Sequence, residues 1–249
     1  MTVVVAFQCT DGAVIAADSM LTTYSGGIAV GHHKGKKIYT LSGNQIFAFA
    51  GDPGQANRFH HLADNKAGEI LTANDPLGYG ISVCQAVIQQ FISTGIQNAI
   101  NLQTALAFPK DNVANCCIYE TNLQPRFLDS DHFYIALGSG KQYADPFLRF
   151  LIDVFCPSNI QPSLIDAIFL AVWVVEHVIQ TNTGGVGGPI RVGILEDTGN
   201  GMTARELSDQ DIDRQKEAIT GALETLNTWR SQVAGEQGPD PDAPPMPKA

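Results

Sequence analysis

Met1-Thr-Val-Val-Val-Ala-Phe-Gln-Cys-Thr-Asp-Gly-Ala-Val-Ile-Ala-Ala-Asp18 is the stretch on which both the fold and the function depend. Its β-branched residues on either side of an Asp-Gly turn predict two short strands, 2–7 and 13–17. A small residue behind the initiator methionine allows Met1 to be removed, which would leave Thr2 at the N-terminus. A terminal threonine carries a hydroxyl and a primary amine whose unperturbed pKa is about 7.7–8. Because such an amine can activate the hydroxyl of its own residue, Thr2 is a candidate N-terminal nucleophile, although most proteins that begin Met-Thr place no chemistry there.

The composition fits a soluble globular protein. The chain has 249 residues, of which 44% are hydrophobic, and its mean hydropathy is near zero. This length is compatible with one large domain of mixed helices and strands. A formal charge of −10 argues against a general nucleic-acid binder or a protein of anionic membrane surfaces. The most apolar run, 167–175, is shorter than the ~20 residues that span a bilayer, so it predicts a buried helix and no membrane partner.

Cysteine usage indicates a reducing compartment. The five cysteines show no CxxC or CxxH spacing, and an odd number without a secretory signal favours free thiols in a cytosol. We therefore expect a cytoplasmic protein. The histidine pairs His32-His33 and His60-His61 lack flanking ligands at metal spacing. Neither a metal nor another cofactor is expected.

The remaining pattern predicts alternating groups of strands and helices. Strands are expected where β-branched and aromatic residues lie between turn residues, and helices where apolar residues recur three or four apart. Residues 21–33, polar and glycine-containing, are expected to form a loop or an irregular strand. Since each sheet face needs apolar cover, this order predicts an α+β domain. Beyond the first two strands, the predicted strands are 38–41, 45–50, 114–120, 124–129, 133–137 and 190–196, and the predicted helices are 53–65, 80–100, 143–155, 163–180 and 208–233.

The C-terminal end differs in composition from the rest. Residues 235–249 contain five prolines and almost no apolar bulk, which predicts a disordered tail. The domain is accordingly expected to span 2–234.

A series of short motifs resembles the pattern of proteasome β subunits in its order and spacing. The resemblance covers about residues 2–215, and it implies a four-layer αββα sandwich of the N-terminal nucleophile hydrolase type. The motifs are Thr2, Asp11-Gly, Ala16-Ala-Asp18, Lys34-Gly-Lys-Lys37, Ile46-Phe-Ala-Phe-Ala-Gly-Asp52, Ala136-Leu-Gly-Ser139-Gly, Thr183-Gly-Gly and Leu207-Ser-Asp-Gln-Asp211.

The resemblance also implies a catalytic role for several residues. Thr2 matches the nucleophile and base, and Lys37 the lysine whose charge lowers nearby pKa values. Asp18 matches the acid that pairs with this lysine. Ala48 matches the position whose backbone N–H binds the oxyanion, and Ser139 the serine that orients the terminal amine.

Further positions match the family's substrate pocket and its supporting loop. Leu21, Ile46 and Ala50 match positions that line the first specificity pocket, which implies an apolar residue before the cleaved bond. The family's Asp-x-x-Ser-Gly-Gly stands here as Gln180-Thr-Asn-Thr183-Gly-Gly. Thr183 keeps the hydroxyl, whereas Gln180 lacks the acid's charge, and Ala48 replaces a glycine.

The function implied by the resemblance is that of a threonine peptidase that hydrolyses unfolded polypeptide chains. The resemblance also implies that copies of this chain assemble into stacked rings that enclose the active sites. Whether an ATPase partner delivers substrates to these rings is left open. Two alternatives stay open. One is a catalytically silent ring subunit, which Gln180 and Ala48 favour. The other is an N-terminal nucleophile amidohydrolase that acts on a small amide.

Overall fold

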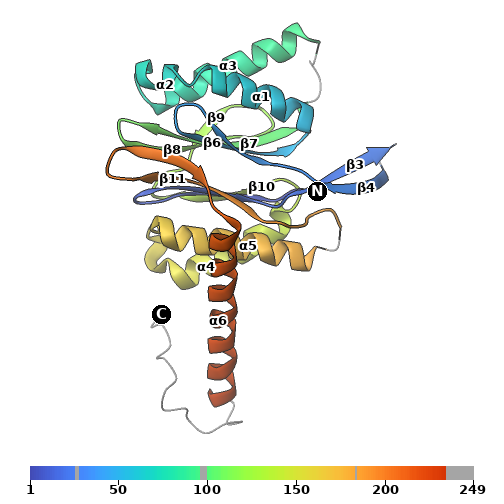
Figure 1. Ribbon diagram of the computed structural model, residues 1–249, viewed down its shortest axis with the longest axis vertical. Helices are drawn as coiled ribbons and strands as arrows, with labels where there is room; N and C mark the ends of the chain where they lie inside the picture. The colour runs from blue at the N-terminus through green and yellow to red at the C-terminus, as the bar shows by residue number, and fades with distance from the viewer. Residues whose placement is uncertain (26–27, 96–99, 183, 234–249) are drawn as a thin grey trace.

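Two sheets packed face to face form the centre of the computed structural model, which describes residues 1–25, 28–95, 100–182 and 184–233 (Figure 1). The helices between residues 53 and 93 cover the outer face of one sheet, and two helices between residues 141 and 181 cover the outer face of the other. This arrangement confirms the predicted four-layer α+β sandwich. The predicted tail, 235–249, lies outside the described residues.

The first sheet is built around the N-terminal hairpin, and the predicted Asp-Gly turn lies between its two strands. Val4 pairs with Ala17 on one side and with Leu137 on the other. Because this sheet has apolar cover on both faces, its central strands read as continuous apolar runs. The strand order is β10-β1-β2-β11-β12, with β1 Val4–Gln8, β2 Gly12–Ala17, β10 Tyr134–Leu137, β11 Arg191–Asp197 and β12 Met202–Glu206.

The second sheet and a projecting hairpin complete the strands. The hairpin of β3 and β4 occupies the segment expected to be a loop or an irregular strand, and its register shifts between Thr23 and Tyr24. In Figure 1 it reaches out from the sandwich near the N-terminus. The second sheet has the order β5-β6-β7-β8-β9, with β3 Met20–Ser25, β4 Ile28–Lys34, β5 Ile38–Leu41, β6 Gln45–Gly51, β7 Leu102–Lys110, β8 Val113–Tyr119 and β9 Pro125–Phe127.

Small side chains allow the two sheets to approach closely. Ala48 and Ala105 pair within the second sheet and are wholly buried in the layer between the sheets. On the facing strand, a Cβ added at Gly193 would lie 2.5 Å from Ile46 Cγ2. Since such an approach is closer than carbon atoms tolerate, Gly193 fixes how Ile46 packs between the sheets.

The helices over the second sheet begin at strong capping signals. Asp52 and Asp75 each cap a helix by accepting a backbone N–H, and a proline follows each of them. The second of these helices begins four residues before its predicted start. The bounds are α1 Pro53–Asn65, α2 Glu69–Thr72 and α3 Pro76–Ser93.

Helices α4 (Lys141–Phe155) and α5 (Leu164–Thr181) cover the first sheet, with the short 3₁₀ turn Pro157–Asn159 between them. Ser163 caps α5 by accepting the Asp166 N–H. Among the described helices, α5 alone is long and apolar enough to cross a membrane. It packs on β1 and β2 and against α4 and α6, which is the position of a core helix.

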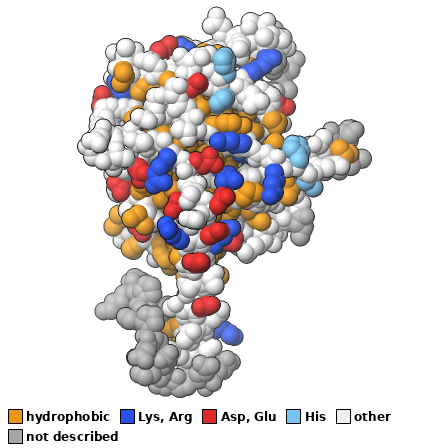
Figure 2. Space-filling view, viewed as in Figure 1, with side chains coloured by type: hydrophobic (Ala, Val, Ile, Leu, Met, Phe, Trp, Pro, Cys, Tyr) orange, Lys and Arg blue, Asp and Glu red, His pale blue; other side chains and the backbone are white. Residues whose placement is uncertain are grey.

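Helix α6 (Asp209–Val233) leaves the body of the molecule after its first turns (Figure 1). Ile212 and Ile219 are buried against the core. Further along, Leu226 and Trp229 are each 43% exposed. The apolar face predicted for this helix therefore continues from the core into solvent. On the face shown in Figure 2, acidic and basic side chains lie interspersed instead of forming one basic patch.

Three elements have no counterpart in the sequence-based prediction. They are β7, α2 and β12. The β7 strand contains two alanines, a glutamine and a proline, which are weak strand formers, and it is specified by pairing with β6 and β8 on its two sides. The β12 strand is polar because it lies at the edge of its sheet.

Candidate active site

Three chain segments bring a hydroxyl, a carboxylate and an ammonium together. Thr2 precedes β1 and Asp18 follows β2, so the antiparallel register of this hairpin places both at one end of the first sheet. Val3 N donates to Asp18 Oδ1 at 3.0 Å. Lys37 precedes β5 and approaches from the second sheet. Its Nζ lies 2.9 Å from Thr2 Oγ1 and 2.7 Å from Asp18 Oδ1.

The Asp18 carboxylate is wholly buried and fully engaged. Besides the Val3 and Lys37 bonds, its Oδ2 accepts Met20 N at 3.0 Å and Gly187 N at 3.2 Å. A buried carboxylate is stable only when donors replace its lost water. Three backbone N–H groups and one ammonium meet that requirement here.

The Lys37 side chain is buried with it. Burial lowers the pKa of Lys37, because loss of water disfavours the ammonium, while the charge of Asp18 and its hydrogen bond act in the opposite direction. The Lys37 amine thus gives up a proton more readily than a surface lysine. Its Nζ donates to Thr2 Oγ1, which places this buried cation directly beside the hydroxyl.

The Thr2 nitrogen faces Ser139, and its distance from Ser139 Oγ is 3.2 Å. With Met1 attached, this nitrogen is a peptide amide that donates to the hydroxyl. In a chain without Met1 it would be the α-amine. The neighbouring backbone is also fixed, since Gly140 N donates to Thr2 O at 2.9 Å.

Glycine is required beside this carbonyl. Gly138 has φ of +84°, and a Cβ there would collide with Thr2 O and lie 2.9 Å from Ala50 Cβ. The turn after β10 therefore packs directly against the Thr2 backbone.

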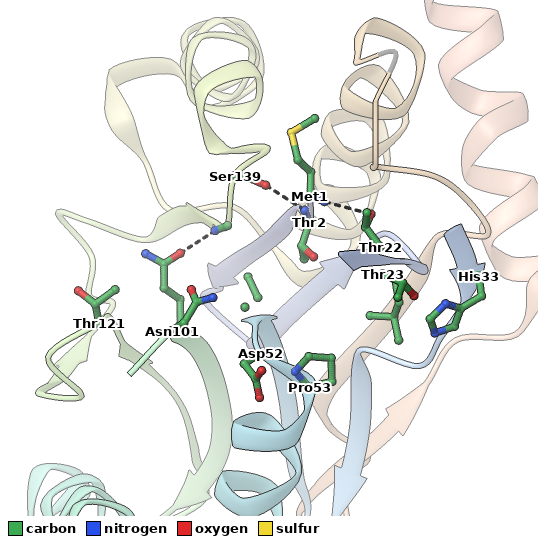
Figure 3. Close-up of a pocket in the computed structure, with 15 residues that line it drawn as sticks. Met1, Thr2, Thr22, Thr23, His33, Asp52, Pro53, Asn101, Thr121 and Ser139 are labelled. Atoms are coloured by element: carbon green, nitrogen blue, oxygen red, sulfur yellow. Dashed lines mark hydrogen bonds between the residues drawn. The ribbon is translucent and has the colours of Figure 1, made fainter. Parts of the chain in front are cut away.

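A cavity of about 810 Å³ opens beside Thr2 (Figure 3). One wall comes from the β3–β4 hairpin, and the other from the end of β6 and the start of β7. Two of the predicted pocket residues, Leu21 and Ala50, line it. The lining residues are Met1, Thr2, Leu21, Thr22, Thr23, His33, Ala50, Gly51, Asp52, Pro53, Asn101, Gln103, Thr121, Gly138 and Ser139.

Other predicted residues lie away from this cavity. Ile46 is not among its lining residues, because its side chain is buried between the two sheets. The Ala48 side chain is buried there as well, and the oxyanion role expected for the Ala48 backbone N–H stays a prediction. The cavity instead reaches β6 at Ala50 and Gly51. Gln180 is exposed at the end of α5. Thr183 lies outside the described residues.

Two residues that contribute to the surroundings of Thr2 were not predicted from the sequence. Gln103 Oε1 accepts Gly138 N at 2.8 Å and so supports the turn beside Thr2. Asn182 is buried, and its Nδ2 lies 3.7 Å from Met1 Sδ. The signal for Asn182 was available in the sequence, because it stands inside the Gln180–Thr183 motif. Gln103 belongs to β7, a strand whose residues carry no local strand signal.

In the part of the chain that the structure describes, no three His, Cys, Asp or Glu residues are grouped so that they could hold a metal ion. The five cysteines are buried free thiols.

Comparison with known proteins matches this architecture to one family. The model of the proteasome subunit family matches residues 2–153. A search of curated proteins returned no match. The solved structures that are similar in fold include two of Anbu from Hyphomicrobium sp. strain MC1. The first, a Gly-1 mutant, has 18% identity and a TM-score of 0.68 over 92% of this chain and 97% of its own. The second has 18% identity and a TM-score of 0.67 over 91% and 97%.

Proposed function

This chain belongs to the proteasome subunit family, and from that premise we propose that it is an N-terminal threonine peptidase. Its nucleophile is the Thr2 hydroxyl, and its base is the Thr2 α-amine once Met1 has been removed. The reaction is hydrolysis of peptide bonds in unfolded chains.

The observation that carries the proposal is the position of Lys37 Nζ, 2.9 Å from Thr2 Oγ1 and 2.7 Å from Asp18 Oδ1. A threonine hydroxyl is a weak nucleophile unless a base accepts its proton and a nearby positive charge stabilises the alkoxide. A wholly buried Lys37–Asp18 pair beside an open cavity supports this chemistry more than a structural role. A purely structural pair would not need contact with an N-terminal hydroxyl.

The proposed reaction has two steps. In the first, Thr2 Oγ1 attacks the peptide carbonyl carbon, and its proton passes to the Thr2 amine. The C–N bond then breaks, the leaving amine takes up that proton, and an ester to Thr2 remains. In the second, the amine accepts a proton from water, whose oxygen attacks the ester. The C–O bond breaks, the new carboxylic acid leaves, and the Thr2 hydroxyl takes its proton back.

The residues of the cavity support a preference for an apolar substrate residue immediately before the cleaved bond. Leu21 and Ala50 are uncharged and both line the cavity to which Thr2 belongs. An apolar residue there would gain from removal of its surface from water. We expect such a residue in preferred substrates.

A homo-oligomeric ring is part of the proposal, with helix α6 as the contact element. Its exposed stripe consists of Leu223, Leu226, Trp229 and Val233, which are 43% to 69% exposed. The stripe continues the face that Ile219 packs onto the core, and Ile219, Leu226 and Val233 recur at heptad spacing. Such a seam fits an apolar helical surface, and the expected occupant is a second copy of this chain.

The decisive experiment combines intact-protein mass with a peptide epoxyketone, a reagent that requires the hydroxyl and the amine of one terminal residue. The expected result is loss of Met1, a doubly linked adduct on Thr2, and hydrolysis of fluorogenic peptides. Thr2→Ala should abolish the adduct and the hydrolysis, whereas Thr2→Ser should retain the adduct. A homogeneous protein that keeps Met1 and forms no adduct would refute the proposal.

A second candidate is a catalytically silent ring subunit. The exposed position of Gln180, where the family carries an acid, favours it. The same experiment separates the two, since a silent subunit would assemble without forming the adduct.

A further inference from the structure

The Met1 side chain lies in a defined cradle beside the cavity. Its amine donates to Thr22 Oγ1 at 3.4 Å. Its sulfur faces Asn182 Nδ2 at 3.7 Å. In Figure 3 the Met1 side chain extends away from Asp52 and Pro53, which lie across the cavity from it. Met1 also packs against the apolar core cluster on the helix side of the first sheet.

The cradle exists because two glycines leave room for Met1. A Cβ added at Gly185 would lie 2.9 Å from the Met1 nitrogen, and a Cβ at Gly184 would lie 3.6 Å from Met1 Cε. Gly185 also has φ of +91°, a conformation that side chains disfavour. Thr22, Asn182, Gly184 and Gly185 thus surround Met1.

Asn182 is held so that its donor faces this space. It is 6% exposed, and its Oδ1 accepts Gly184 N at 3.0 Å. The amide oxygen is therefore used by the chain, and the NH₂ group is left to face the occupant. This NH₂ group can donate to a thioether sulfur, and together with the apolar neighbours it favours an uncharged side chain over a cation.

We propose that this cradle, vacated when Met1 is removed, is a binding subsite for the residue that follows the cleaved bond, and that it takes an unbranched apolar side chain of methionine's size. The inference rests on the proposed function. Met1 is bonded to the Thr2 nitrogen, and the leaving amine must come within hydrogen-bond reach of that same nitrogen to receive its proton. The residue attached to the leaving amine is thereby brought next to the vacated space.

The test compares quenched fluorescent peptides that differ only in the residue after the cleaved bond: methionine, norleucine, aspartate or lysine. An aminocoumarin substrate with the same acyl part has no residue at that position and reports acylation alone. We expect kcat/KM for the methionine and norleucine peptides to exceed that for the aspartate and lysine peptides by about tenfold or more. Equal values for the four peptides would overturn the subsite.

Two variants locate the effect. Gly184→Leu should fill the cradle and reduce the methionine-to-aspartate ratio toward one, while Gly68→Leu, at an open position where an added Cβ meets no atom within 4 Å, should leave the ratio unchanged. Asn182→Asp replaces the NH₂ donor with a carboxylate acceptor of the same shape. This variant should raise kcat/KM for the lysine peptide relative to kcat/KM for the methionine peptide. A ratio that neither cradle variant moves would contradict the assignment.

The two proposals fail in different ways. If the wild-type protein forms the epoxyketone adduct and cleaves the aminocoumarin substrate but shows no preference, only the subsite is wrong. If no adduct forms, both the proposed peptidase activity and the proposed subsite are wrong.

Discussion

Thr2 Oγ1 and Lys37 Nζ form a 2.9 Å hydrogen bond although they belong to segments that lead into different sheets. The bond therefore depends on how the two sheets pack, in addition to the geometry of either one. Ala48, Ala105 and Gly193 lie in the close contact between the sheets. The nucleophile and its charge partner are positioned by the same small side chains that form the inter-sheet core.

Removal of Asp18 should cost more stability than removal of Lys37. Asp18→Ala leaves the buried Lys37 ammonium without its counter-charge, and we expect a loss of about 3–5 kcal/mol. Lys37→Met leaves Asp18 with three backbone donors, so we expect about 1–3 kcal/mol. Urea unfolding of both variants measures the difference. Equal losses of unfolding free energy in the two variants would show that the three backbone donors alone do not stabilise the buried Asp18 carboxylate.

Gly138→Ala should disturb the site far more than a matched glycine change. At Gly138 and Gly199, φ is +84° and +81°, so alanine costs each about 1–2 kcal/mol of backbone strain. Only at Gly138 does the new Cβ meet Thr2 O and Ala50 Cβ, which adds about 1–3 kcal/mol and displaces Thr2. Epoxyketone labelling rates should therefore fall in Gly138→Ala and stay unchanged in Gly199→Ala. Parallel behaviour of the two variants would argue against the close contact.

Ser139→Ala should lower kcat while leaving the fold intact. The lost hydrogen bond to the Thr2 nitrogen is worth about 0.5–1.5 kcal/mol, which corresponds to roughly a two- to tenfold change. The pH dependence of kcat should shift as well, because the hydroxyl contacts the nitrogen that serves as base. Ser93→Ala, at the exposed end of α3, is the control. An unchanged pH profile would make Ser139 a turn residue only.

The histidine at position 177 should reduce stability in mild acid. Burial lowers the pKa of His177, whose ring stacks on Phe147 at 4.0 Å between centroids. Protons then bind the unfolded chain more readily than the folded one. The free energy of unfolding should fall as pH drops below about 6.5, the unfolded value, and the loss is complete below the folded pKa. In His177→Gln this part of the loss should be absent in denaturation series between pH 5 and 8.

Charges placed on the α6 stripe should weaken self-association. Leu226→Glu is expected to lower the assembled mass measured by light scattering, because it puts a carboxylate into the proposed contact with a second copy. Thr228→Glu, on the exposed surface of the same helix, adds the same charge outside the stripe. If both variants retain the wild-type mass, or if the wild type is monomeric at all concentrations, α6 is not the contact.

Local signals explain which elements were predictable from the sequence. The β1–β2 hairpin is defined by its Asp-Gly turn, and α1 and α5 by Asp52-Pro53 and Ser163. Strand β7 carries no such signal. Its alanines are small because the facing sheet is close, and its Gln103 reaches the Gly138 turn. Both properties arise only from tertiary packing.

The same distinction applies to the site. The motifs around Thr2, Asp18 and Lys37 predicted three side chains that the structure brings within hydrogen-bond distance. Ile46 and Ala50 share one face of β6, and only the position along the strand decides that one meets Gly193 while the other meets the cavity. That position follows from the pairing register, which the motifs do not contain.

The Asp18 carboxylate accepts the backbone N–H groups of Val3, Met20 and Gly187, and so ties the first residues of the chain and the distant segment at Gly187 to the end of its own strand. A molecule in which any one of these places has come loose also loses the support of its Lys37 ammonium. Partially folded chains would then have no peptidase activity, instead of cleaving peptides without selection. A titration of the reactive Thr2 in a preparation would therefore count the molecules that are completely folded.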